Sequence, residues 1–119
     1  MKVLVTGCSG FAGRHAIAAL RQAGHEVVGG DVACPPGFSI PCQTLDVRNL
    51  DSIVRALGET RPDAILHLGG IAFVPLGWTE PQLVFSVNTV GTLNLLDAVR
   101  RQAPATRGAF LSRLRTSPP

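Results

Sequence analysis

Three glycines near the start of the chain have the type and spacing needed to hold a phosphate-bearing ligand. Gly7, Gly10 and Gly13 lie three residues apart, directly after the apolar run Lys2–Thr6. A pyrophosphate needs backbone N–H donors at close range, and glycine leaves that backbone bare. The start of a helix adds unpaired N–H groups and a positive dipole end. We therefore predict a dinucleotide pyrophosphate at this loop, against the alternative of a glycine turn without a ligand. The further predicted contacts in the loop are Ser9, as a hydroxyl donor, Phe11 and Ala12.

An acidic residue stands where the other end of such a ligand would lie. Asp31 comes just past the second apolar run, Glu26–Gly30, roughly the 20 residues beyond the loop that a dinucleotide fingerprint requires. A carboxylate there accepts both hydroxyls of the adenosine ribose and repels a 2′-phosphate. Asp31 therefore predicts NAD as the cofactor rather than NADP.

Alternating strands and helices are expected to position these residues. The predicted strands are Lys2–Thr6, Glu26–Gly30, Gln43–Leu45, Asp63–Leu68 and one that starts within Ala109–Leu111. The predicted helices are Phe11–Ala23, ended by Gly24, one from Asn49 or Asp51 to Leu57, ended by Gly58, and a long one from Pro81 to Gln102. Such alternation predicts an α/β fold, a doubly wound parallel sheet that stops after about the fifth strand.

Composition and charge favour one globular domain without a nucleic-acid or membrane partner. The 119 residues are 45% hydrophobic and 16% charged, which suits a packed core. Up to Val99 six basic residues face eight acidic ones, and the last twenty residues add five arginines and no acid. Arginines spread through a Pro/Ser-rich end indicate a solvated tail rather than a nucleic-acid footprint. No apolar stretch approaches the ~18 residues of a membrane span.

The cysteines predict neither a disulfide framework nor a metal site. Cys8, Cys34 and Cys42 are an odd number and show no C-x-x-C spacing. We therefore expect free thiols, no metal ligands and a reducing, cytoplasmic setting.

Several motifs in order along the chain resemble those of one known family. The G-x-x-G-x-x-G loop, Asp46-Val47, His67-Leu68-Gly69-Gly70 and the helix segment Asn88–Leu96 together resemble the extended short-chain dehydrogenase/reductase superfamily. Within this superfamily, the resemblance is to the NAD-dependent epimerases and dehydratases of nucleotide sugars. The resemblance spans Met1 to about Pro104.

The resemblance implies a Rossmann fold, NAD as cofactor and a nucleotide-sugar substrate for the full-length family. It implies adenine contacts for Asp46 and Val47, and a segment Leu68, Gly69 and Gly70 that closes over the cofactor. Two residues keep alternative interpretations: Asp46 as the cap of a turn, and His67 as a satisfied core histidine. Within the superfamily, the stretch from Phe73 through Trp78 to Pro81 looks most like the GDP-mannose 4,6-dehydratase and 4-keto-6-deoxymannose reductase branch.

The family's acid/base pair has no counterpart in this sequence. The chain contains no tyrosine, and its only lysine is Lys2, so a Tyr-x-x-x-Lys motif is absent and no catalytic residue is predicted. We interpret residues 1–104 as the N-terminal part of an NAD-binding domain and residues 105–119 as an atypical Arg/Ser/Pro-rich tail, with a frameshift or truncation near Thr106–Ser112. The predicted function is cofactor binding without turnover by this chain alone. The alternative is a complete, non-catalytic dinucleotide sensor of the atypical short-chain type.

Overall fold

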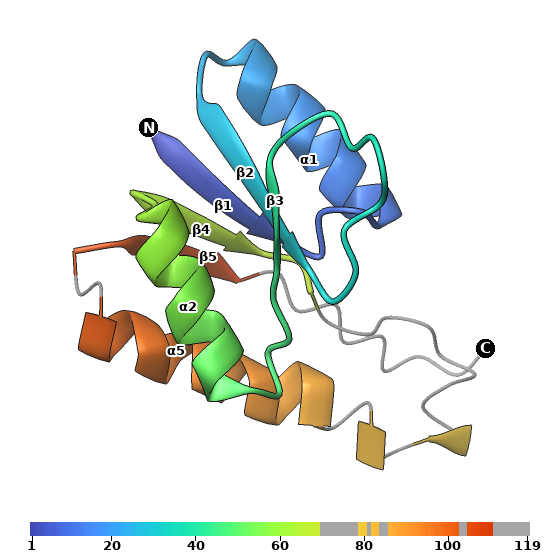
Figure 1. Ribbon diagram of the computed structural model, residues 1–119, viewed down its shortest axis with the longest axis vertical. Coiled ribbons are helices and arrows are strands. Elements are labelled where there is room, and N and C mark those ends of the chain that lie inside the picture. The colour runs from blue at the N-terminus through green and yellow to red at the C-terminus, as the bar shows by residue number, and fades with distance from the viewer. Residues whose placement is uncertain (70–78, 81, 84–85, 103–104, 111–119) are drawn as a thin grey trace.

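Five parallel strands form one sheet in the order β3-β2-β1-β4-β5, as the computed structural model shows (Figure 1). The structure describes residues 1–69, 79–80, 82–83, 86–102 and 105–110. The strands are β1 (Lys2–Thr6), β2 (Glu26–Asp31), β3 (Cys42–Thr44), β4 (Ala64–His67) and β5 (Arg107–Phe110). This is the predicted Rossmann-type sheet.

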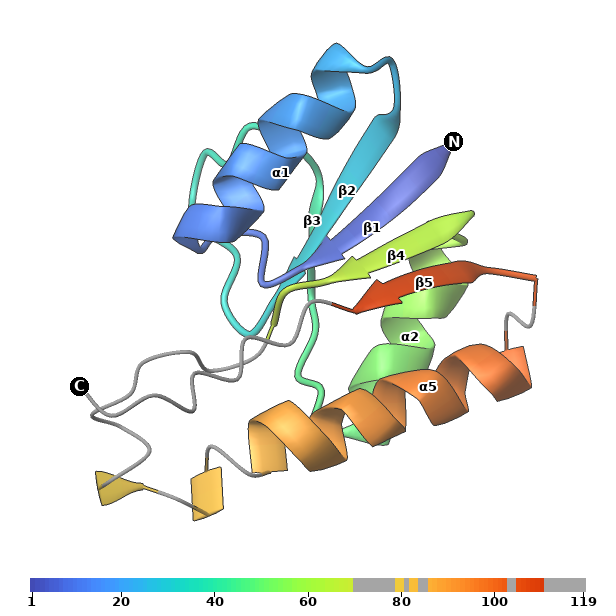
Figure 2. The same ribbon diagram turned by 180° about the vertical axis from the view of Figure 1, so that it is seen from behind.

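Helices cover both faces of the sheet (Figures 1 and 2). The helical elements are α1 (Phe11–Gln22), α2 (Leu50–Thr60), a π-helical turn η1 (Ser86–Val90) and α5 (Gly91–Gln102). On the α1 face, Ile17 packs with Val3, Val5 and Val27. On the other face α2 and α5 bury a larger cluster: Leu4, Val28, Leu45, Val47, Ile53, Ala56, Leu57, Ile65, Leu95 and Ala98. Because β1 lies at the centre, both of its faces are buried, which explains its unbroken apolar run.

Helix α2 begins as predicted and ends later than predicted. Of the two predicted caps, Asn49 is the one used, since its side chain accepts hydrogen bonds from the amides of Asp51 and Ser52. The expected stop at Gly58 is wrong. The helix continues to Thr60, and the C-cap residue that follows, Arg61, has a left-handed φ of 45°. The residue before a proline avoids the α conformation, so Pro62 rather than Gly58 stops the helix.

Strand boundaries differ from the prediction where hydrogen bonds to a neighbouring strand decide them. Asp31 is the last residue of β2, because it pairs with Thr44 of β3. Strand β5 begins at Arg107, which pairs with Ala64 and donates its amide hydrogen to the Asp63 carbonyl at 3.0 Å. This strand lies beyond residue 104, and the division of the chain at that residue stays a prediction.

The long helix predicted from Pro81 to Gln102 is interrupted in the part that the structure describes. Residues Ser86–Val90 form a π-helical turn, and the regular α-helix begins at Gly91. The apolar spacing that predicted a single helix does not distinguish these two windings.

The prediction that the cysteines form no disulfide is wrong. Cys34 and Cys42 are joined by a disulfide, while Cys8 is a buried free thiol. Pairing of β3 with β2 returns the chain beside its own earlier loop, so two cysteines separated by 8 positions come within 5.9 Å between their Cα atoms. Spacing along the sequence does not reveal this return. Closing so short a loop restricts the unfolded chain by about 2–3 kcal/mol in the chain-entropy account.

Two exposed glycines, at which an added Cβ would meet nothing within 4 Å, give a matched test of backbone conformation. Gly58 lies inside α2, whereas Gly24 has a φ of +90°. We expect Gly58→Ala to stabilise the fold by about 0.5–1 kcal/mol through helix propensity. Gly24→Ala should destabilise it by about 1–2 kcal/mol, because an L-residue is strained at that φ. Urea unfolding of both variants checks this, and equal effects would contradict it.

Candidate functional site

The carboxyl ends of β1 and β4 bring two bare stretches of main chain into contact. Gly7 follows β1 with a φ of +66°, and its amide donates to the Gly30 carbonyl at 2.8 Å. A Cβ at Gly7 would lie 2.7 Å from the Leu68 carbonyl oxygen and 2.9 Å from the Cα of Gly69. The strand that follows β1 in sequence, β2, pairs on one side of β1, and the strand that follows β4, β5, pairs on the opposite side of β4. Open α/β sheets bind ligands at such a switch point.

The glycine-rich loop leads directly into α1 with no side chain over the helix start. Gly10 is the N-cap and makes no side-chain capping bond. The first turn of α1 contains no acidic residue. Its first intrahelical bond is donated by Arg14 to the Gly10 carbonyl at 3.0 Å, which leaves the amides of residues 11–13 ahead of the helical ladder. Such a helix start favours an anion.

Gly13 allows α1 to approach the loop closely. A Cβ on this buried glycine would lie 2.8 Å from the Cα of Cys8 and would also overlap the Gly7 carbonyl. Gly10 is different, because a Cβ there would meet only the Gly7 oxygen, at 3.4 Å. The fold therefore requires glycine at position 13 and has room for a larger residue at position 10.

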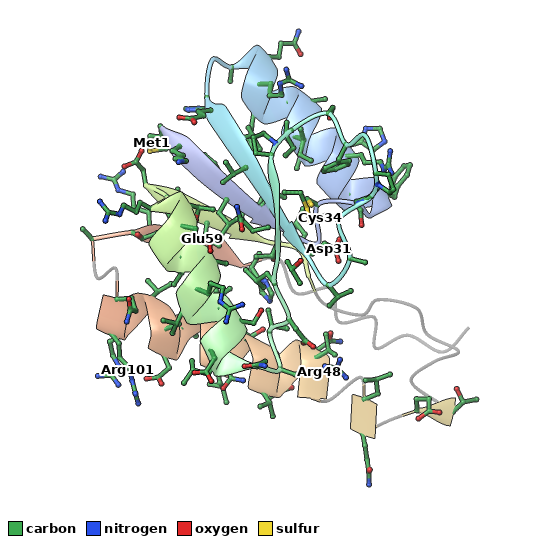
Figure 3. All side chains as sticks on the ribbon, in the orientation of Figure 1. Met1, Asp31, Cys34, Arg48, Glu59 and Arg101 are labelled. Carbon is green, nitrogen blue, oxygen red and sulfur yellow. A yellow bond between two sulfur atoms is a disulfide. The ribbon has the colours of Figure 1, made fainter. Side chains whose placement is uncertain are left out.

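Asp31 is hydrogen-bonded to the glycine-rich loop. Its Oδ2 accepts from the Ser9 hydroxyl at 2.6 Å and from the Ser9 amide at 3.2 Å, and its Oδ1 accepts from the Val32 amide at 2.8 Å. The Ser9 hydroxyl, predicted as a phosphate donor, thus points its proton at Asp31. Asp31 is partly exposed where β2 meets the following loop (Figure 3). A carboxylate has about four acceptor positions. Hydroxyls of a ligand can therefore bind to Asp31 at the position that the Ser9 hydroxyl occupies.

A directed chain of hydrogen bonds fixes the contact between β1 and β4. Thr6 Oγ1 accepts from the amides of Leu68 at 3.0 Å and Gly69 at 3.1 Å. These two bonds use both lone pairs of the Thr6 hydroxyl oxygen. The hydroxyl therefore donates its proton to Nδ1 of His67, which lies 2.6 Å away. His67 Nε2 therefore carries the ring proton and lies 3.4 Å from Thr92 Oγ1, which donates to the Asn88 carbonyl at 2.8 Å.

This network supports the structural interpretation of His67. Its side chain is buried and is built into the contact that positions Leu68 and Gly69. Burial lowers the pKa of the imidazole, which keeps the ring neutral. The sequence predicted the position of His67, whereas the role of Thr6 was missed because a threonine at a strand end has no distinctive pattern.

Asp46 caps a turn in the structure. Its carboxylate accepts from the Arg48 amide at 3.0 Å and forms two further bonds with the Arg48 guanidinium, both 3.1 Å. The Arg48 side chain, through these bonds, lowers the pKa of Asp46. Asn94 Nδ2 donates to the Val47 carbonyl at 3.0 Å and so links α5 to this turn, a role that the sequence analysis missed. The adenine contacts of Asp46 and Val47 stay predictions.

Most of the predicted residues lie at the carboxyl edge of the sheet. The loop Gly7–Gly13, Asp31 and the pair Leu68–Gly69 come together around the ends of β1, β2 and β4. Phe11 is 83% exposed and leaves a large apolar ring at the mouth of the loop. Gly70, Trp78 and Ser112 lie outside the described residues. Within the described ranges, no group of three His, Cys, Asp or Glu side chains could hold a metal ion.

Comparison with known proteins assigns the fold and these motifs to a family. Residues 3–112 match the family model described as the NAD dependent epimerase/dehydratase family. The chain is 40% identical over 100 residues to a GDP-6-deoxy-D-talose 4-dehydrogenase of Aggregatibacter actinomycetemcomitans, covering 83% of this chain and 30% of that protein. It is 35% identical over 111 residues to a GDP-6-deoxy-D-mannose reductase of Pseudomonas aeruginosa, covering 92% and 32%.

A solved structure gives the same assignment. The UDP-glucose 4-epimerase of Thermus thermophilus, in complex with NAD, matches with a TM-score of 0.77 and 37% identity, over 86% of this chain and 34% of that one. The chain thus spans about a third of the length of these relatives. In the described part of this chain, no helix has the length and apolar character that a bilayer crossing requires. The family recognised from the motifs is confirmed.

The neutral state of His67 gives a prediction about pH. The pKa of His67 is lower in the folded state than the unfolded value of about 6.5, so the unfolded state binds more protons as pH falls. Stability should be complete above about pH 6.5 and decline below it, by at most about 1.4 kcal/mol per pH unit, the slope for one proton. His67→Asn keeps an acceptor for Thr6 and removes this titration.

Urea unfolding between pH 4.5 and 8 measures the effect. The free energy of unfolding of the wild type should fall more steeply below pH 6.5 than that of His67→Asn. His25→Asn makes the same substitution between α1 and β2, outside the hydrogen-bond network of His67, and is the matched control. Parallel curves for wild type and His67→Asn would show that His67 does not titrate as described.

Proposed function

Because the chain belongs to the NAD dependent epimerase/dehydratase family, we propose that it binds the adenosine and pyrophosphate part of NAD. It would form the N-terminal cofactor-binding part of an enzyme acting on a nucleotide sugar. The observation that supports this most is the uncapped start of α1, beside a loop whose glycines leave the main chain bare. The amides of Phe11, Ala12 and Gly13 are the expected donors to the pyrophosphate.

Asp31 is the expected ribose partner and the reason for proposing NAD rather than NADP. Its carboxylate is held by Ser9 and by the Val32 amide beside the phosphate loop. The ribose hydroxyls would replace the Ser9 hydroxyl as donors to Oδ2. A 2′-phosphate would bring a second negative charge against the same oxygens. Asp46, Val47 and the segment Leu68–Gly70 complete the proposed set of contacts.

We propose that this chain does not turn over a substrate by itself. Bound NAD supplies a hydride acceptor, and a proton must leave the sugar hydroxyl in the same reaction. The chain has no tyrosine, and its only lysine, Lys2, is the first residue of β1, at the opposite end of the strand from the glycine-rich loop. A non-catalytic dinucleotide sensor is the second candidate, and the absence of a Tyr-x-x-x-Lys motif from this sequence favours it equally. The cytoplasmic setting, the nucleotide-sugar substrate and the tail beyond residue 104 stay predictions.

Gly10→Ala tests the pyrophosphate site separately from the fold. An added methyl group at position 10 meets only one protein atom, at 3.4 Å, so the free energy of unfolding should change by less than about 1 kcal/mol. The same methyl group would stand between the main chain and a pyrophosphate. We expect NAD affinity to fall about tenfold or more, measured by isothermal titration calorimetry.

Gly58→Ala is the matched control, because it makes the same substitution at an exposed position of α2. It should leave NAD affinity unchanged. Absence of NAD binding by the wild type, or equal affinity for wild type and Gly10→Ala, would contradict the proposed site.

Asp31→Asn tests the choice of cofactor. It keeps the size of the side chain and removes the charge that disfavours a 2′-phosphate. We expect the ratio of NADP to NAD affinity to rise at least about tenfold, the effect of ~1.4 kcal/mol. Glu59→Gln removes one negative charge near the end of α2, distant from Asp31 in Figure 3, and should not change the ratio. A ratio unaffected by Asp31→Asn would assign the selectivity to other residues.

A further inference from the structure

The free thiol of Cys8 lies against the disulfide between Cys34 and Cys42. The Sγ atoms of Cys8 and Cys42 are 3.7 Å apart. Cys8 belongs to the glycine-rich loop, Cys42 begins β3, and Cys34 lies in the loop after β2 (Figure 3). Three sulfur atoms from three separate segments thus meet on the α1 face of the sheet.

Strand pairing places Cys8 and Cys42 beside each other. Gly29 of β2 pairs with Cys42, and its amide donates to the Pro41 carbonyl at 2.8 Å. A Cβ at Gly29 would lie 2.6 Å from Cys8 Sγ, so this glycine provides the space that the thiol fills. The proximity of the two sulfurs therefore depends on the register of the sheet, not on a flexible side chain.

The three sulfurs differ in their access to solvent. Cys8 is fully buried, whereas Cys34 and Cys42 are partly buried. An external oxidant or thiol can reach the disulfide but not the free thiol. The only disulfide within reach of Cys8, among the described residues, is the one that it already touches.

We propose that Cys8, Cys34 and Cys42 form a thiol–disulfide exchange site beside the glycine-rich loop. Cys8 loses its proton to solvent, and its thiolate attacks Cys42 Sγ. A bond forms between Cys8 and Cys42, the bond between Cys42 and Cys34 breaks, and Cys34 leaves with the electron pair and takes up a proton. One thiol and one disulfide are present before and after, so the step needs no external oxidant or reductant.

The exchange changes two parts of the fold at once. A disulfide is about 2.05 Å long, so Cys8 and Cys42 must approach by more than an ångström, which moves the glycine-rich loop. Release of Cys34 frees the adjoining loop, whose residues Pro35–Ser39 line a hollow of about 320 Å³ together with Arg14 and Ile17 of α1. This consequence rests on the proposed function: the displaced glycine-rich loop binds NAD less tightly.

Burial sets the resting state of the site. Desolvation, and secondarily the Asp31 carboxylate, raises the pKa of the Cys8 thiol, while Arg14 acts in the opposite direction. Cys8 is therefore a thiol near neutral pH, and exchange is best measured at pH 8.5, where the thiolate fraction is larger.

Cys34→Ser tests the contact between Cys8 and Cys42 directly. The reduced variant is treated with oxidised glutathione, then denatured in acid, alkylated and mapped by mass spectrometry. We expect an internal Cys8–Cys42 disulfide, formed at least about tenfold faster than in the same variant in urea, because the fold holds the two sulfurs together. In the matched variant Cys42→Ser, we expect a glutathione adduct on Cys34 and no internal disulfide. Identical outcomes for the two variants would overturn the proposal.

The wild type provides a second measurement that does not depend on how either variant folds. The oxidised protein is incubated at pH 8.5, samples taken over time are denatured in acid, and the single free thiol in each is located by alkylation. Label that appears on Cys34 as well as on Cys8 supports exchange, and label confined to Cys8 at all times overturns it.

Coupling to the cofactor is read separately. We expect oxidised Cys34→Ser to bind NAD about tenfold more weakly than its reduced form. Equal affinities would overturn the coupling while the exchange site stands. A chain that binds no NAD in either form contradicts the proposed function and leaves the disulfide mapping as the test of the exchange.

Discussion

The structure depends on the contact of bare main chain at the carboxyl ends of β1 and β4. Gly7 lies so close to Leu68 and Gly69 that no side chain fits between them, and Gly13 brings α1 equally close to the same loop. These approaches leave backbone amides at a surface without side chains over them. A negatively charged, extended ligand can then use the main chain as its donor set, which is the basis of the proposed NAD site.

Polar side chains hold this contact in place from two sides. Thr6 and His67 join the ends of β1 and β4 through a chain of hydrogen bonds, and burial keeps the imidazole neutral. Ser9 and Asp31 connect the glycine-rich loop to the end of β2. The sulfurs of Cys8 and Cys42 touch beneath the same loop. A change at any of these positions therefore reaches, through one or two contacts, the amides that are proposed to bind the pyrophosphate.

The sequence predicted the parts of the fold that local patterns determine. Buried strands, the start of α1 at Phe11 and a cap of α2 at Asn49 or Asp51 follow from apolar runs and capping chemistry, and the structure uses Asn49. The disulfide of Cys34 could not be predicted, because it depends on the pairing of β3 with β2. The roles of Thr6 and Asn94 depend likewise on contacts between distant segments, and a single sequence does not show these.

The proposed function depends on binding of the pyrophosphate by the main chain of the glycine-rich loop. Titration of ¹⁵N-labelled protein with NAD, followed in amide spectra, tests it most directly. We expect the largest shifts on the amides of residues 9–13, with smaller ones at Asp31 and at Leu68–Gly69. Shifts absent from residues 9–13, or concentrated at the amino ends of the strands, would contradict it.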